Sequence, residues 1–170
     1  MNKNLKKLTL TALLATLTFI MTRYFAIPTA IGGSINIGDS IVLLGGLILG
    51  PVYGAFSAAI GSAIADIVSP YAIYTLATFI IKGFVALTIA YLFKKLKNLD
   101  LNVRLLISAA VAEVIMVLGY FIFEAFILEF GVIVAGYEIL NNSIQAISSI
   151  FLVTLLYVSL SKSSIIKKLK

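Results

Sequence analysis

The chain has 170 residues, of which 61% are hydrophobic and 12% charged, and its mean hydropathy is +1.12. A water-soluble domain of this size cannot bury so much apolar surface, so the composition indicates an integral membrane protein. The chain contains no Cys and no His. Disulfides, thiolate nucleophiles, imidazole bases and the usual zinc ligands are therefore excluded, and no metal or cofactor site is predicted.

The Lys and Arg residues are strongly clustered. Eleven of the 13 lie at the N-terminus, at residues 94–97, at Arg104, and at Lys162, Lys167, Lys168 and Lys170. Membrane proteins keep short basic segments on the cytoplasmic side, so both termini and the 94–104 loop are predicted to be cytoplasmic. The net charge of +6 is then a determinant of orientation, and no nucleic-acid partner is predicted.

The first apolar segment covers residues 5–22 and is followed by a loop, since residues 24–40 are rich in Gly, Asn and Pro. The next run, residues 40–65, carries no charge. As one helix it would be about 39 Å long, more than the ~30 Å apolar core, and a single crossing would place the 94–97 cluster outside. A break at Gly50-Pro51 removes both problems, because Gly suits a helix end and Pro a first helical turn.

That break leaves a second segment too short to cross a bilayer alone, about 16 Å as a helix. We therefore expect it to start within the membrane, below a capping loop that dips in after the first helix. Irregular backbone at that depth survives only beside protein or a watery cavity. Short, Gly/Pro-interrupted segments are also the best sequence pointer to a transporter's binding site.

The sequence thus predicts an all-α integral membrane protein with six transmembrane segments, N-in and C-in, in a single domain over residues 1–170. An outer loop holding Gly136 and Glu138 is expected before the last segment. The six segments are predicted at about residues 5–22, 39–50, 51–68, 74–93, 103–126 and 140–160.

Lys82 and Glu113 are the two charges predicted near mid-membrane, each about 15 Å from the end of its segment. An ionised group at that depth costs several kcal/mol (about 2.5–3.5 or more) unless it is paired or solvated. Either the two residues form a buried ion pair that fixes helix register, or one or both face a ligand cavity.

Other candidate ligand contacts lie in the outer half. Tyr120 and Glu124 follow Glu113 at helical spacing, although Glu124 is alternatively a solvated residue near the surface. The amides of the last segment either hold helices together or contact a ligand, and the aromatic rings either stack on it or form an interfacial belt. The complete set is Asn36, Asp39, Tyr74, Phe79, Lys82, Glu113, Tyr120, Glu124, Asn141, Asn142 and Gln145.

Small residues form a ladder on the first segment, through the pairs Thr11/Ala15 and Ala12/Thr16. Such spacing allows close approach of another helix. The ladder serves either docking to another membrane protein or packing within this chain.

Three stretches carry a family resemblance: IGDS at residues 37–40, GLILGPVYGA at 46–55 and TFIIKG at 78–83. They resemble the substrate-binding S components of energy-coupling factor (ECF) transporters. The most similar group is the riboflavin-transporter-like family that includes hydroxymethylpyrimidine and pyridoxine carriers.

The resemblance implies six helices with both termini inside and a vitamin pocket open to the outside, capped by the loops after the first and third helices. It also implies docking, through an Ala-x-x-x-Ala pattern on the first helix, to a membrane coupling subunit that carries two cytoplasmic ATPases. In this chain Thr replaces one Ala of each pair. The expected protein is a non-enzymatic vitamin-binding subunit in a bacterial plasma membrane; the alternative is a small membrane scaffold without a ligand.

Overall fold

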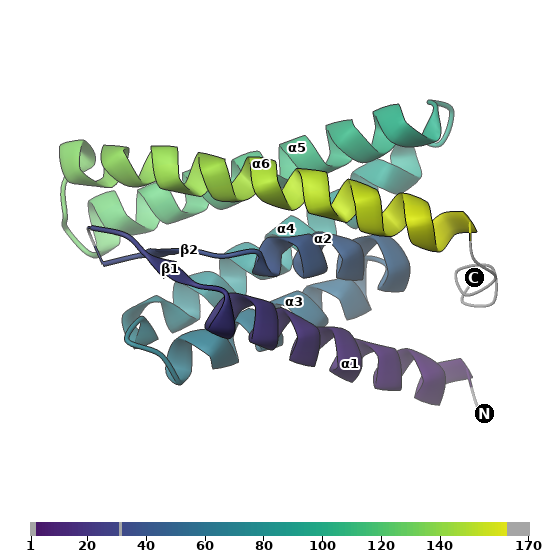
Figure 1. Ribbon diagram of the computed structural model, residues 1–170, viewed down its shortest axis with the longest axis horizontal. Helices are drawn as coiled ribbons and strands as arrows, with labels where there is room; N and C mark the ends of the chain where they lie inside the picture. The colour runs from purple at the N-terminus through teal and green to yellow at the C-terminus, as the bar shows by residue number, and fades with distance from the viewer. Residues whose placement is uncertain (1–2, 31, 163–170) are drawn as a thin grey trace.

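The computed structural model describes residues 3–30 and 32–162, and this part of the chain is a helical bundle with one small β-hairpin (Figure 1). The basic residues Lys167, Lys168 and Lys170 lie outside the described residues. The elements are α1 (Lys3–Tyr24), β1 (Ile27–Pro28), β2 (Ser34–Ile35), α2 (Gly38–Leu49), α3 (Pro51–Ile67), the 3-10 helix η1 (Ala72–Tyr74), α4 (Thr75–Lys95), α5 (Leu101–Ile122), the π-helical turn η2 (Phe123–Ile127) and α6 (Val132–Lys162).

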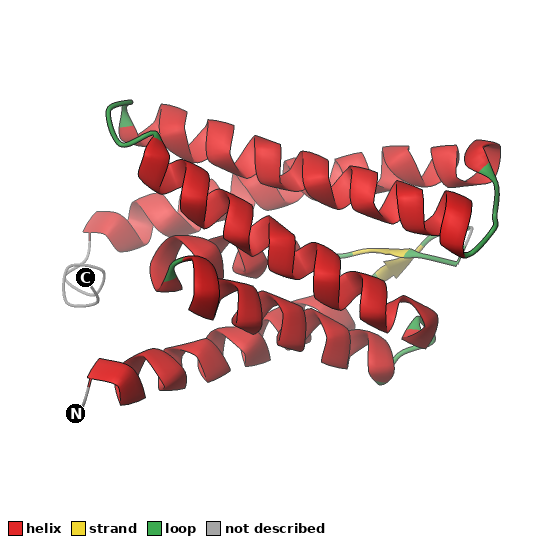
Figure 2. Ribbon diagram, turned by 180° about the vertical axis from the view of Figure 1, so that it is seen from behind, coloured by secondary structure: helices red, strands yellow, loops and turns green. Residues whose placement is uncertain are grey.

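The helices run back and forth between two ends of the molecule. The described ends of the chain lie together at one end, beside the α2–α3 and α4–α5 turns, whereas the hairpin and the α3–α4 and α5–α6 connections lie at the other (Figures 1 and 2). The basic cluster at residues 94–97 therefore lies at the same end as the basic start of α1. This arrangement matches what the charge pattern requires of an N-in, C-in protein.

The chain breaks between α2 and α3 where the sequence predicts a break. Gly50 has φ +79°, a left-handed conformation that favours glycine, and Pro51 is the first residue of α3. The turn is tight because Gly54 faces Gly46, where an added Cβ would lie 2.7 Å from the Gly46 Cα atom. A Cβ on Gly46 would in turn meet the Ala86 carbonyl, so α2, α3 and α4 pack backbone against backbone.

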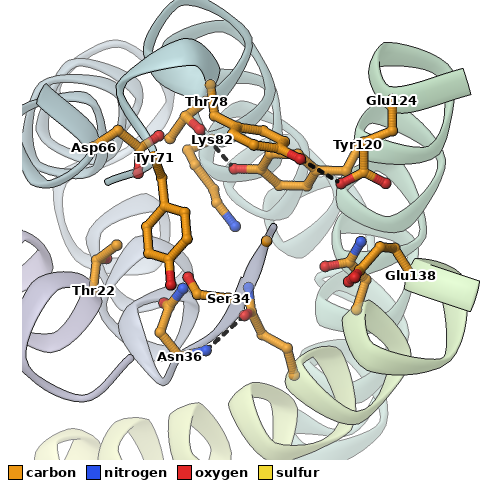
Figure 3. Close-up of a pocket in the computed structure, with 14 residues that line it drawn as sticks. Thr22, Ser34, Asn36, Asp66, Tyr71, Thr78, Lys82, Tyr120, Glu124 and Glu138 are labelled. Carbon is orange, nitrogen blue, oxygen red and sulfur yellow. Dashed lines mark hydrogen bonds between the residues drawn. The ribbon is translucent and has the colours of Figure 1, made fainter. Parts of the chain in front are cut away.

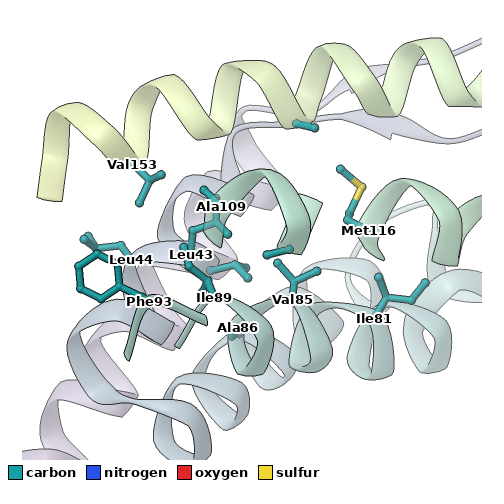
Figure 4. Packing of buried hydrophobic residues seen from close by; sticks show 14 of the residues in the cluster. Leu43, Leu44, Ile81, Val85, Ala86, Ile89, Phe93, Ala109, Met116 and Val153 are labelled. Atoms are coloured by element: carbon teal, nitrogen blue, oxygen red, sulfur yellow. The ribbon is translucent and has the colours of Figure 1, made fainter. Parts of the chain in front are cut away.

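Most of the apolar core lies in the half of the bundle nearer the chain ends, although Ala77 near the start of α4 also belongs to it. Leu43 of α2 lies beside Val85 and Ile89 of α4. Ala109 and Met116 of α5 close the cluster from above (Figure 4). Val85 is completely buried there, as are Leu43 and Met116. The half that carries the hairpin buries mostly polar side chains instead.

The structure differs from the expectation in the loop after α1 and at the start of the last helix. The loop after α1 contains a short antiparallel hairpin, pairing Ile27 with Ile35 and Pro28 with Ser34. The last helix begins at Val132 and not near residue 140, so Gly136 and Glu138 lie in a helix rather than in an outer loop. The apolar residues just after Gly131 support these extra turns, and a helical Gly costs only about 1 kcal/mol.

Four of the helices are long and apolar enough to cross a bilayer: residues 4–24, 72–95, 101–127 and 132–161. The other two, α2 with 12 residues and α3 with 17, are shorter apolar helices. Six crossings with both termini inside remain a prediction.

Cysteine labelling tests that topology, because the chain contains no Cys. Pro70 lies exposed in the α3–α4 connection and Asn98 lies exposed in the α4–α5 turn. In intact cells, an impermeant thiol reagent should label Pro70→Cys and not Asn98→Cys, and permeabilised cells should label both. The reverse pattern would contradict the N-in, C-in assignment.

Candidate functional site

A polar cavity of about 40 Å³ lies in the half of the bundle that carries the hairpin (Figure 3). The loop after α1 and the α3–α4 connection both contribute to its walls, as expected of capping loops. Seven of its residues are candidates from the sequence: Asn36, Tyr74, Lys82, Tyr120, Glu124, Asn142 and Gln145. Seven others are not: Thr22, Gly33, Ser34, Asp66, Tyr71, Thr78 and Glu138.

The base of the cavity is built on an ion pair between α4 and α2. Lys82 Nζ lies 2.7 Å from both carboxylate oxygens of Asp39, and both residues are almost completely buried. Gln145 of α6 donates its amide to Asp39 Oδ2 at 2.7 Å. The Gln145 carbonyl accepts the backbone N–H of Asn36 at 2.8 Å. One chain of charged and polar contacts thus joins α4, α2, α6 and the capping loop.

Of the two interpretations left open for Lys82 and Glu113, the ion pair between them is wrong, because Lys82 pairs with Asp39. Glu113 is 1% exposed, and neither of its oxygens has a hydrogen-bond partner among the described residues. It lines a separate apolar groove between α5 and α6, beside Val117 and Ala146, rather than the cavity. The position of Glu113 along its segment correctly predicted that it is buried. That position could not predict which side of α5 faces Lys82.

Three further carboxylates reach the cavity. Glu124 accepts a 3.3 Å hydrogen bond from the Tyr74 hydroxyl, and Glu138 accepts one from the Thr29 hydroxyl at 2.7 Å. Asp66 comes from the end of α3. Among the described residues, Asp66 Oδ2 and Glu124 Oε2 have no hydrogen-bond partner. The cavity therefore holds acceptor oxygens that the protein itself does not use.

Tyrosine rings form another part of the lining. The rings of Tyr74 and Tyr120 are tilted by 54° with their centroids 6.3 Å apart. The Tyr120 hydroxyl is hydrogen-bonded to Thr78 at 3.0 Å, and Lys82 Nζ lies 5.0 Å from the centre of its ring. Tyr71 faces them from the α3–α4 connection (Figure 3).

The remaining candidates do not line the cavity. Asp39 contacts the lining residues Lys82 and Gln145, and Asn141 donates to Glu138 Oε2 at 3.2 Å. Phe79 is 39% exposed and lines an apolar groove with Phe56 of α3 and Ile80. For Phe79 the interpretation as part of an interfacial belt is favoured over ligand stacking.

Two of the missed residues carried a signal. Asp66 is an acid inside an apolar segment, which by itself points to function. Glu138 precedes Asn142 by four residues and Gln145 by seven, so all three share one helix face once α6 is known to start at Val132. The contributions of Thr22 and Ser34 depend on how the loop folds back, which no spacing rule predicts.

The small-residue ladder of α1 is split between two faces. Ala12 and Thr16 are exposed, while Thr11 and Ala15 are half-buried. The Ala15 carbonyl is in close contact with Gly61 of α3, so this part of the ladder packs internally. The Thr16 hydroxyl bonds to the Ala12 carbonyl at 2.9 Å, which leaves an apolar outward surface.

Stability measurements should identify the partner of Lys82. Lys82→Met strands the buried Asp39 carboxylate, so it should lower the free energy of unfolding by roughly 3–5 kcal/mol. Adding Asp39→Asn should restore most of that loss, whereas adding Glu113→Gln should not. Thermal unfolding of the single and double variants in detergent provides the comparison, and rescue by Glu113→Gln alone would contradict the observed pairing.

Comparisons with known proteins agree with this architecture. The family model of the ECF-type riboflavin transporter S component matches residues 2–162. An uncharacterised protein of Pyrococcus woesei, from the gap 3′ region, is 33% identical over 120 residues, which is 71% of this chain and 77% of that protein.

A solved structure of the S component of a bacterial ECF transporter has the same fold, with a TM-score of 0.70 and 20% identity over 93% of this chain and 96% of that one. S components are membrane-embedded binding subunits of vitamin transporters that associate with membrane and ATPase subunits, and they are not themselves enzymes. The chain belongs to the ECF-type riboflavin transporter S component family.

Proposed function

We propose that this chain is the substrate-specific subunit of an ATP-driven ECF importer for a small, planar, water-soluble vitamin or precursor, pyridoxine-like or hydroxymethylpyrimidine-like. The observation that supports this most directly is the buried polar cavity, whose tyrosine rings lie beside amide, hydroxyl and carboxylate groups. Apolar or aromatic walls with a few convergent polar groups are typical of small-molecule sites.

The size of the cavity favours a small ligand. A volume of about 40 Å³ accommodates only a few water molecules, because each needs about 10–15 Å³ of such volume. A one-ring vitamin requires a modest outward shift of the walls, and a three-ring flavin requires a much larger one. The name of the matching family therefore does not decide the substrate.

The hairpin loop is the wall best suited to move. Among the described residues, two side-chain hydrogen bonds connect it to α6: the Asn36 N–H to Gln145 and the Thr29 hydroxyl to Glu138. Both are single hydrogen bonds, each with a net value of about 0.5–1.5 kcal/mol, or up to about 3 when one partner is charged. We infer that the loop opens at modest cost to admit the vitamin and closes over it.

A scaffold protein without a ligand explains fewer observations. It needs helix-packing surfaces, but it has no use for a lysine, three carboxylates and three tyrosines gathered around one buried space. Buried charge in a membrane protein is costly and marks functional sites.

Mass spectrometry of compounds released from the detergent-purified protein tests this function directly. We expect a vitamin or vitamin precursor with one aromatic ring. Asn142→Leu, in the cavity wall, should weaken its binding about tenfold or more, since a polar contact is lost and bulk is added. Asn98→Leu, in the exposed α4–α5 turn, is the matched control and should bind normally. Absence of any retained or titratable vitamin would reject the proposal.

Docking to the coupling subunit is the second part of the proposed function. Ala12→Leu adds bulk to the exposed apolar face of α1 and should abolish uptake by the complete transporter, while ligand binding to the isolated chain stays within about twofold, because helices in membranes associate through small residues. Val111→Phe adds bulk to the exposed face of α5 and should leave both activities intact. Equal loss of binding and uptake in Ala12→Leu would show that this face packs internally.

A further inference from the structure

We propose that the vitamin bound in this cavity is an organic cation, with a positive charge on its ring or on an amine attached to the ring. This inference rests on the proposed function and narrows its substrate class. It depends on the charges, the unused oxygen atoms and the rings that surround one buried space.

The charges around the cavity do not cancel. The ammonium group of Lys82 is already neutralised, since both oxygens of Asp39 lie 2.7 Å from it. The three remaining acids of the cavity wall are Asp66, Glu124 and Glu138, and no other Lys or Arg among the described residues lines the cavity. A cationic ligand would supply the missing positive charge, and opposite charges attract strongly where little water screens them.

Two of these carboxylates have a buried oxygen atom without a hydrogen-bond partner among the described residues. Asp66 is 8% exposed and Glu124 is 3% exposed, and both line the cavity. Within the described part of the chain, Asp66 Oδ2 and Glu124 Oε2 have no hydrogen-bond partner. Buried polar atoms are normally satisfied, and an ionised carboxylate only accepts hydrogen bonds. The complementary ligand therefore donates hydrogen bonds or carries positive charge on the sides that face α3 and η2.

The aromatic lining favours the same class of ligand. Tyr71, Tyr74 and Tyr120 come from two different parts of the bundle and face one space. The face of an aromatic ring attracts a cation, and cages of aromatic rings are a common way to bind quaternary and alkylated ammonium groups. A planar cation can stack on one of these rings while its charge faces the carboxylates.

An anionic vitamin would meet the opposite situation. Its carboxylate or phosphate would approach three acids, and the one nearby ammonium group already has an anionic partner. Charges of the same sign brought together in a buried site oppose binding.

Pyridoxamine and pyridoxine provide a matched test, because they share one ring and differ in a protonated aminomethyl group against a neutral hydroxymethyl group. We expect the purified chain to bind pyridoxamine at least about tenfold more tightly than pyridoxine, as charged hydrogen bonds are the stronger ones. Asp66→Asn and Glu124→Gln keep the side-chain shape and should each reduce that preference, because they weaken the binding of pyridoxamine more than that of pyridoxine. A thermal unfolding midpoint close to that of the unmodified chain shows that these variants fold.

Glu129→Gln is the control for charge alone. Glu129 is an exposed acid in the α5–α6 connection and does not line the cavity, so its neutralisation should not change the preference. Equal or tighter binding of pyridoxine by the unmodified chain would overturn the inference. So would a preference for pyridoxamine that survives in the Asp66→Asn/Glu124→Gln double variant.

The inference and the proposed function can fail separately. If neither probe binds, the compound that copurifies with the chain decides: a vitamin with a cationic group supports the inference, and one without such a group overturns it while the proposed function stands. A chain that retains no vitamin and binds neither probe would contradict both.

Discussion

The ion pair between Lys82 and Asp39 is the interaction on which the rest of the site depends. Neither charge could remain in the middle of an apolar bundle alone, so each needs the other at close range. The pair joins α4 to the short helix α2, and Gln145 extends the connection to α6 and to the capping loop. Because Asp39 lies in the first turn of α2, the pair also determines where the irregular backbone before that helix must lie.

The bundle divides into two halves with different physical tasks. In the half near the chain ends, small and aliphatic residues let helices approach closely, and glycine at Gly46 and Gly54 allows backbone contact. In the other half, hydroxyl, amide and acidic side chains replace them, and the packing leaves a cavity. The apolar half thus holds the helix ends around a space that the hairpin loop helps to line.

Much of this organisation could be predicted from the sequence, because it follows from patterns along single segments. The break at Gly50 and Pro51 follows from local backbone preferences. The clustering of basic residues correctly predicts that the described chain ends and the α4–α5 turn lie at the same end of the bundle. Helical spacing and side-chain type predicted seven of the 14 residues that line the cavity. The partner of Lys82 could not be found in this way, because Asp39 is 43 residues away and reaches it only through the packing of α2 on α4.

The predictions for the start of α6 and for the loop after α1 failed for a related reason, because both depend on the assembled bundle. The early start of α6 depends on weak local preferences around Gly136, and it decides whether Glu138 belongs to a loop or to the helix face that carries Gln145. The hairpin loop brings Ser34 and Gly33 over the cavity through contacts with α6 that are over a hundred residues apart in the chain. Such contacts depend on the assembled bundle and leave little trace in local composition.

The three acids of the cavity have a consequence for the direction of net uptake. A vitamin that receives a phosphate group in the cytoplasm would bring new negative charge, and the wall formed by Asp66, Glu124 and Glu138 would no longer accept it. A phosphorylated vitamin would then no longer bind in the cavity. Its return to the outside through the same site would therefore decrease as phosphorylation proceeds. Under the proposed function, the cell would then retain the vitamin through its own chemistry as well as through ATP-driven import.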